Sequence, residues 1–127
     1  LITQRVYTKL YSPGCWQPAV AGTVEKGETY LDNVIKETKE ELGIEVLPEQ
    51  LREAIYQYND TSHKYFSQSY VAKLDSSIES FVIPKSEVES IRWVSLEDLY
   101  LWIKDRPQDF VTSFEAYADS HKNFMES

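Results

Sequence analysis

The spacing of apolar residues along the chain predicts a helix from about Tyr30 to Gly43. At about 100° per residue, one side of this helix collects four residues that can pack into a core: Leu31, Ile35, Thr38 and Leu42. Thr29, followed three residues later by Asp32, has the spacing of a capping box. Gly43 suits a left-handed C-terminal cap, so both ends of the helix are specified locally.

The rest of the chain reads as short strands and two further helices. Strands are predicted over residues 1–6, 54–58, 65–74 and 91–94, and residues 16–24 form another β-prone stretch. Ser95 with Asp98, and Thr112 with Glu115, mark the starts of the later helices. This order predicts one α+β domain over residues 1–127, an α/β/α sandwich with a sheet between helices.

The composition is typical of a protein that folds around its own apolar core, without disulfides, in a reducing compartment. The 127 residues include nine tyrosines, five phenylalanines and three tryptophans, and we expect Trp93 to lie in the core. Cys15 is the only cysteine, so no internal disulfide can form. Neither an apolar run of about 18 residues nor a signal peptide is visible, which predicts a cytoplasmic protein with no membrane partner.

The charge of the chain is strongly negative. Its net charge of −8 repels nucleic acid backbones, and no basic stripe interrupts it, so no nucleic acid partner is expected. The same charge would repel an anionic small molecule unless metal ions bridge the two. His63 and His121 lack partners at zinc-ligand spacing, so a zinc site is not indicated.

Side chains that could bind such bridging metal ions lie on the polar side of the helix predicted at residues 30–43. Glu37, Glu40 and Glu41 form an i, i+3, i+4 set opposite the apolar residues. Like charges at this spacing repel, so the arrangement costs stability unless cations neutralise it. Mg²⁺ and Mn²⁺ prefer such oxygen ligands, and the three carboxylates therefore predict a site for one of these ions against phosphate oxygens.

The sequence from Gly22 to Ile44, GTVEKGETYLDNVIKETKEELGI, resembles the Nudix box, G-x5-E-x7-R-E-U-x-E-E-x-G-U, in which U is apolar. Both glycines and all four glutamates match, while Lys36 replaces the arginine and Thr38 replaces an apolar residue. Residues 7–14, 16–22 and 87–95 are similar to the branch of the Nudix family close to isopentenyl diphosphate isomerase. The resemblance implies a mixed sheet flanked by helices. Family members usually carry one more strand before position 1, so an N-terminal strand is expected to be missing.

The resemblance also implies roles for individual residues. Glu37 and Glu41 match the strongest metal ligands, and Glu40 matches a residue that shares a metal or positions the attacking water. The backbone carbonyl of Ala21 corresponds to a further ligand in some members. Glu87, in a loop outside the box, is the candidate for another ligand, with a solvated loop charge as the alternative. These residues would bind Mg²⁺ or Mn²⁺.

Other residues would support that site. Glu28 matches a structural glutamate that pairs with the box arginine, here Lys36, and lysine keeps the charge but loses the bidentate geometry. Gly22 and Gly43 shape the ends of the box. Two basic residues, Arg5 and Lys9, could meet phosphate or be ordinary surface charges.

The resemblance implies hydrolysis of a diphosphate linkage in a nucleoside diphosphate derivative or a similar small diphosphate. One alternative is a Nudix domain that binds a nucleotide without turning it over. Another is isomerisation of isopentenyl diphosphate, which is disfavoured because the isomerases' essential cysteine aligns with Ala21 and their histidine with Thr23. The isomerases also lack the Glu40–Glu41 pair. Nudix domains often dimerise, so a homodimer is possible.

Overall fold

The computed structural model describes residues 1–60 and 62–125. The helices are α1 (Tyr30–Leu42), α2 (Leu96–Asp105) and α3 (Phe114–Met125). The strands are β1 (Ile2–Arg5), β2 (Trp16–Pro18), β3 (Leu51–Asp60), β4 (Lys64–Ala72) and β5 (Val88–Arg92). No helix in these residues is both long and apolar enough to span a membrane.

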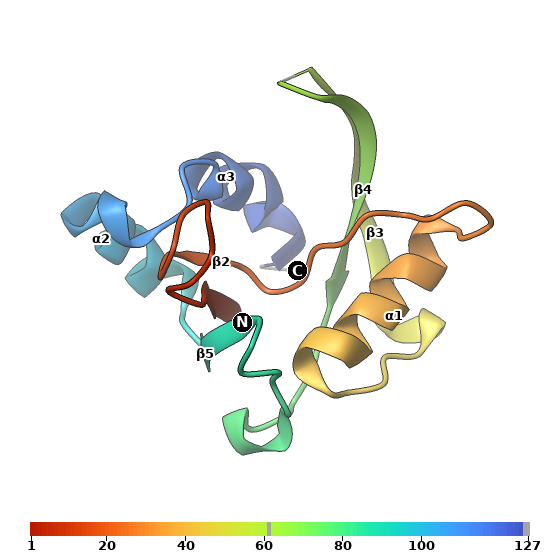
Figure 1. Ribbon diagram of the computed structural model, residues 1–127, viewed down its shortest axis with the longest axis horizontal. Coiled ribbons are helices and arrows are strands. Elements are labelled where there is room, and N and C mark those ends of the chain that lie inside the picture. The colour runs from red at the N-terminus through yellow and green to blue at the C-terminus, as the bar shows by residue number, and fades with distance from the viewer. Residues whose placement is uncertain (61, 126–127) are drawn as a thin grey trace.

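The strands pair into two antiparallel sheets (Figure 1). One sheet has the order β2-β1-β5, with Thr3 opposite both Gln17 and Ile91, and the other is the β3–β4 hairpin. The α+β class is therefore confirmed, but the expected single mixed sheet is divided in two in the described part of the chain. Because β3 and β4 are consecutive and only three residues separate them in sequence, they pair with each other.

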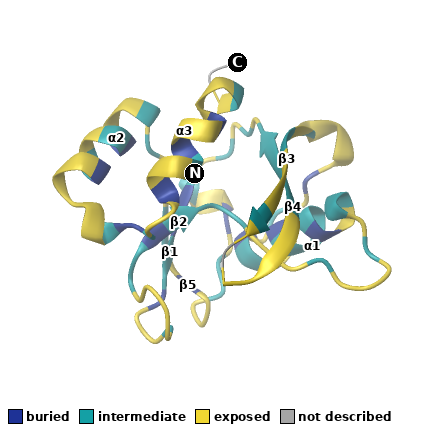
Figure 2. Cartoon of the chain, turned by 90° about the horizontal axis from the view of Figure 1, so that it is seen from above, coloured by how far each residue is buried: buried dark blue, intermediate teal, exposed yellow. Residues whose placement is uncertain are grey.

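Each sheet has its own helices. In Figure 1, α1 lies beside the β3–β4 hairpin, and α2 and α3 lie on the other side of the molecule, beside the three-stranded sheet. The buried core joins β1 and β2 to α2 and α3, and it consists of Ile2, Trp16, Leu99, Ile103, Phe110, Phe114 and Ala118. Figure 2 shows these buried positions gathered where the two helices face the sheet. Trp102 packs edge-on against Trp16 at 5.6 Å and so extends this core outward.

The part formed by α1 and the β3–β4 hairpin meets the part formed by the three-stranded sheet, α2 and α3 at a buried histidine on α3. His121 is 5% exposed, and its Nδ1 lies 2.8 Å from the Tyr117 carbonyl oxygen, to which it must donate a hydrogen bond. Its Nε2 is then the acceptor, and it lies 2.7 Å from the Ser69 hydroxyl on β4. An apolar cavity of about 850 Å³ lies beside this contact, lined by Val34 and Leu42 of α1, by Ala118 of α3 and by His121 itself.

The ends of α1 agree with the sequence prediction. The Thr29 hydroxyl accepts a hydrogen bond from the Asp32 N–H at 3.0 Å, and the Asp32 carboxylate accepts one from the Thr29 N–H at 3.3 Å. Gly43 closes the helix with a φ of 69°. A side chain at Gly43 would also meet the Val82 carbonyl oxygen at 2.7 Å. Both the positive φ and this close contact therefore require glycine there. Helix α2 likewise begins after its predicted cap, Ser95, whose side chain accepts from the Asp98 N–H.

Several predicted boundaries shift. Strand β5 ends at Arg92 rather than continuing to residue 94, and the β-prone stretch 16–24 keeps only three strand residues. In the loop expected at 59–64, Asn59, Asp60 and Lys64 belong to strands β3 and β4, and Thr61 lies outside the described residues. Trp93 is 42% exposed, so its placement in the core was wrong. Its ring lies at the surface, where the indole N–H donates to the Ser76 carbonyl oxygen at 3.0 Å.

Candidate functional site

The acidic side of α1 turns away from the core, as expected. Thr38 and Leu42 are buried, Glu37 and Glu41 are half-buried, and Glu40 is exposed. The Thr38 hydroxyl, which stands where the box has an apolar residue, donates to the Val34 carbonyl oxygen at 2.6 Å. Because that hydroxyl has a partner within its own helix, the substitution leaves no unsatisfied polar group in the core.

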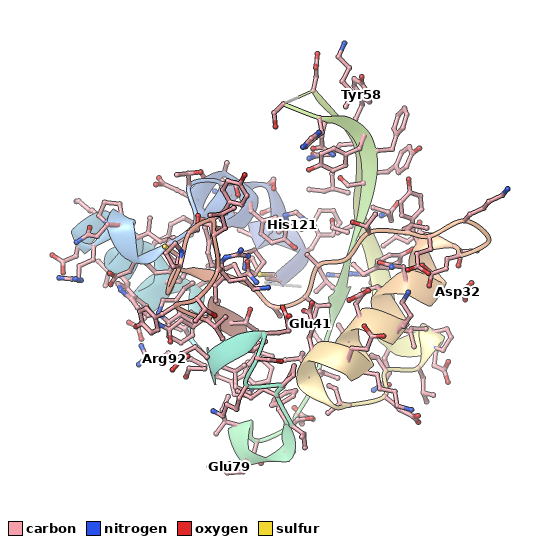
Figure 3. The ribbon with its side chains drawn as sticks, in the orientation of Figure 1. Asp32, Glu41, Tyr58, Glu79, Arg92 and His121 are labelled. Atoms are coloured by element: carbon pink, nitrogen blue, oxygen red, sulfur yellow. The ribbon has the colours of Figure 1, made fainter. Side chains whose placement is uncertain are left out.

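A small pocket of about 150 Å³ lies where the end of α1 faces the three-stranded sheet. Figure 3 shows Glu41 near the centre of the molecule, between α1 and β5. The pocket is lined by Arg5, Lys9, Gln17, Ala21, Glu41, Glu87 and Val88. Five of these residues are candidates from the sequence, drawn from four separate segments of the chain.

Glu41 is the most perturbed acid of this pocket. Its pKa is raised from 4.5 to about 7, first by burial and then by the negative charges of Glu37, Glu87 and Glu40, while a hydrogen bond from the Ala21 backbone opposes the shift. Glu41 therefore lies in an environment that disfavours its charged form. A cation bound beside it would reverse that preference.

Glu37 lies against the glycine that opens the box. A Cβ placed on Gly22 would lie 2.4 Å from Glu37 Cγ and 2.6 Å from its Cδ. The backbone at Gly22 therefore touches the acidic side chain directly. Partial burial, followed by repulsion from Glu40, raises the pKa of Glu37.

The loop between Gly22 and α1 is fastened to the helix by two groups. The expected ion pair is present, with Lys36 Nζ 2.9 Å from Glu28 Oε2. Asn33, which the sequence analysis did not single out, is 5% exposed, and its amide nitrogen donates to the Thr23 carbonyl oxygen at 3.0 Å. The same nitrogen lies 3.4 Å from Glu28 Oε1. Asn33 lies four residues before Glu37, on the acidic side of the helix, so the apolar pattern gave no signal that could have found it.

Replacing Asn33 with alanine should loosen this loop. The change removes the donor to the Thr23 carbonyl oxygen, which we expect to destabilise the protein by about 0.5–1.5 kcal/mol, the net contribution of a typical hydrogen bond. Urea denaturation measures this loss, and limited proteolysis should show faster cleavage within residues 22–28. Asn123, an exposed asparagine on α3, supplies the control substitution Asn123→Ala. Equal stability of Asn33→Ala and the control would contradict the assignment.

Two basic residues line the same pocket as the carboxylates. Arg5 donates from Nη1 to Gln17 Oε1 at 3.2 Å and from Nε to the Tyr11 carbonyl oxygen at 3.0 Å. Lys9 Nζ lies 2.5 Å from Glu87 Oε2. Gln17, which no motif marked, thus orients one of the two cations. Cys15 does not line the pocket, and its thiol lies 3.6 Å from the Gln108 carbonyl oxygen.

The donor set suits a hard divalent cation. Its members are carboxylates and a backbone carbonyl, and burial together with neighbouring negative charges raises the pKa of Glu41. Within residues 1–60 and 62–125, no three histidine, cysteine, aspartate or glutamate side chains lie close enough together to hold an ion. Glu41 and Glu87 line one pocket, while Glu37 and Glu40 lie outside its lining.

Comparison with known proteins places the chain in a family. The family model described as the NUDIX domain matches residues 1–114. The chain belongs to the NUDIX family. This family supplies the box motif that the four glutamates and two glycines resemble, and its members generally use divalent metals.

Two relatives are named isopentenyl-diphosphate Delta-isomerase. The protein of Cutibacterium acnes is 29% identical over 116 residues, which cover 84% of this chain and 58% of the relative. The protein of Shigella flexneri serotype 5b is 28% identical over 115 residues, covering 87% of this chain and 62% of the relative. The chain thus spans about three fifths of the length of these curated relatives.

A solved structure supports the fold. The crystal structure of DR0079 from Deinococcus radiodurans is 23% identical, with a TM-score of 0.63. The alignment covers 82% of this chain and 63% of that chain. At this identity the likeness shows a NUDIX-type fold and nothing more specific.

Proposed function

We propose that this chain is a metal-dependent NUDIX hydrolase that cleaves the diphosphate linkage of a nucleoside diphosphate derivative or a similar small diphosphate. The observation that carries the proposal is that Glu41 and Glu87 share one pocket with Arg5 and Lys9. The carboxylates suit a divalent cation, and the two basic side chains suit phosphate oxygens. A substrate that bridges the metal ion and the basic side chains must offer oxygens to both, as a diphosphate does.

Each residue has a part in this reaction. Glu37 and Glu41 would hold Mg²⁺ or Mn²⁺, with Glu87 and the Ala21 carbonyl as further oxygen ligands. The bound metal would withdraw electron density from the phosphoryl group and lower the pKa of the attacking water. Arg5, fixed by Gln17 and the Tyr11 carbonyl, would bind and orient the phosphate oxygens. Glu40, exposed one residue before Glu41, would orient the water.

Isomerisation of isopentenyl diphosphate is the second candidate, because the two relatives described above are named for it. The residue that aligns with the isomerases' cysteine is Ala21, which lines the pocket but offers no thiol. Cys15 does not replace it, because it lies outside the pocket lining. The absence of a nucleophilic or acidic side chain at position 21 favours hydrolysis over isomerisation.

The proposal is tested on purified protein with Mg²⁺ or Mn²⁺ and a panel of diphosphates. The panel contains nucleoside diphosphate sugars, dinucleoside polyphosphates and isopentenyl diphosphate. Phosphorus NMR should show new phosphate monoester signals for at least one compound, and the signals should disappear with a chelator. Formation of an allylic diphosphate would support the isomerase instead. Tight nucleotide binding without turnover across the panel would identify a binding module.

A further inference from the structure

We propose that Lys9 acts as an internal counter-cation, pairing with Glu87 until a metal ion and a diphosphate bind, so that these two ligands bind cooperatively. The inference rests on the proposed function, and it adds a control of metal binding at the same pocket. Lys9 is here a positioning residue that acts through Glu87.

The ion pair joins two distant parts of the chain at the pocket. Lys9 Nζ and Glu87 Oε2 lie 2.5 Å apart although 78 residues separate them in sequence. Both line the pocket that contains Glu41. Arg5 lines the same pocket but donates to the neutral oxygens of Gln17 and Tyr11. Of these two basic residues, Lys9 is therefore the one that holds a candidate metal ligand.

The pair can exchange partners because it is accessible. The side chains of Lys9 and Glu87 are 32% and 58% exposed, and ion pairs this open to water are individually weak. The base of the loop that carries Lys9 is fixed, since Gln4 Nε2 donates to the Gly14 carbonyl oxygen at 3.0 Å. A Cβ at Gly14 would lie 2.4 Å from the Tyr7 ring, so that ring covers the loop. The long lysine side chain can thus turn while the loop backbone stays in place.

The exchange links the two ligands. A metal ion that takes Glu87 Oε2, the oxygen paired with Lys9, displaces the lysine, and a phosphate that draws Lys9 away frees the same oxygen. Binding of either ligand in this way breaks the same pair. Whichever ligand binds first removes this cost for the second, and by linkage the effect is reciprocal. Because the pair is exposed, its contribution should be about two- to fivefold in affinity.

The test measures Mn²⁺ affinity by titration calorimetry, without any diphosphate. Lys9→Met should tighten Mn²⁺ binding, partly because a nearby positive charge is lost. The part that acts through Glu87 is isolated in a double-mutant cycle with Glu87→Gln. The gain from Lys9→Met should be about two- to fivefold larger in the wild-type background than in the Glu87→Gln background. An equal gain in both backgrounds would overturn the inference.

A second measurement uses methylenebisphosphonate, a diphosphate analogue that is not hydrolysed, with Mn²⁺ present. Lys9→Met should weaken binding of this analogue while it tightens binding of Mn²⁺ alone. Arg5→Met is the matched control. It should weaken analogue binding, and its effect on Mn²⁺ affinity should be the same in the wild-type and Glu87→Gln backgrounds. If wild-type protein bound no Mn²⁺, the proposed function would fail as well. If it hydrolysed diphosphates but showed no coupling in the cycle, the inference alone would fail.

Discussion

Replacing Glu41 with glutamine is expected to abolish turnover and, at the same time, to stabilise the metal-free protein above pH 7. The loss of activity follows from its place in the pocket, where it is the box glutamate that faces Arg5, Lys9 and Glu87. Residues that only orient metal ligands cost 10- to 100-fold when removed, so loss of a ligand should lower kcat/KM by at least about 100-fold. Steady-state assays on the best substrate of the panel measure this.

The gain in stability follows from the raised pKa. Glu41 titrates at about 7 in the folded protein against 4.5 as the ordinary value, because burial and neighbouring carboxylates disfavour its charge. A raised folded-state pKa means that folding favours the protonated form. The associated stability is complete below about pH 4.5 and is lost as the pH rises through 7. Glutamine keeps the shape without the charge, so we expect the variant to be about 1–3 kcal/mol more stable at pH 8.

Chemical denaturation from pH 5 to pH 9, with a chelator present, measures the difference between the two proteins. The difference should be small at pH 5 and grow up to about pH 8. Glu89→Gln, which changes an exposed glutamate on β5, should show no such growth. A stability difference between Glu41→Gln and wild type that stays constant with pH would contradict the assigned environment of Glu41.

Adding Mn²⁺ should reverse the order of stability. A metal ion that binds only the folded state stabilises it by an amount that rises with its concentration. Wild type should gain this stabilisation, and Glu41→Gln should lose most of it. The carboxylate that weakens the empty protein is thus the one that would hold the metal, a conflict between stability and function that is common at active sites.

Helix α1 could be predicted from the sequence because its signals are local. Thr29 and Asp32 lie within one turn of each other, and Gly43 closes the helix with its own backbone angle. The division of the sheet and the exposure of Trp93 depend instead on which distant segments pair and pack. The alternation of residues within one strand contains no such information, so only the α+β class could be predicted.

The candidate site shows the same contrast. The order of glutamates on α1 is a local pattern, and the family motif names its members. That Glu41 would share a pocket with Arg5 and Glu87 could not be read from spacing, since β1, α1 and the loop before β5 lie far apart in sequence. Asn33 and Gln17 were missed because they act through hydrogen bonds to residues outside their own elements, Asn33 to Thr23 and Gln17 to Arg5.

Replacing Gly22 with alanine should lower activity with little effect on stability. Gly22 is not among the described residues with a positive φ, so alanine fits its backbone. The added methyl group would, however, lie 2.4 Å from Glu37 Cγ and 2.9 Å from its Oε1. The flexible side chain of Glu37 must then move, and we expect kcat/KM and Mn²⁺ affinity to fall by about 10- to 100-fold. The free energy of unfolding should change by less than about 1 kcal/mol.

The effect of Gly22→Ala should act through Glu37 alone, and a double-mutant cycle isolates that path. Glu37→Ala removes the atoms that the new methyl group would meet, so adding Gly22→Ala to it should cause almost no further loss of Mn²⁺ affinity. A further loss as large as in the wild-type background would mean that glycine is required by the loop backbone instead. The site would then require glycine for the path of the chain from Gly22 to the start of α1, rather than for the position of the Glu37 carboxylate.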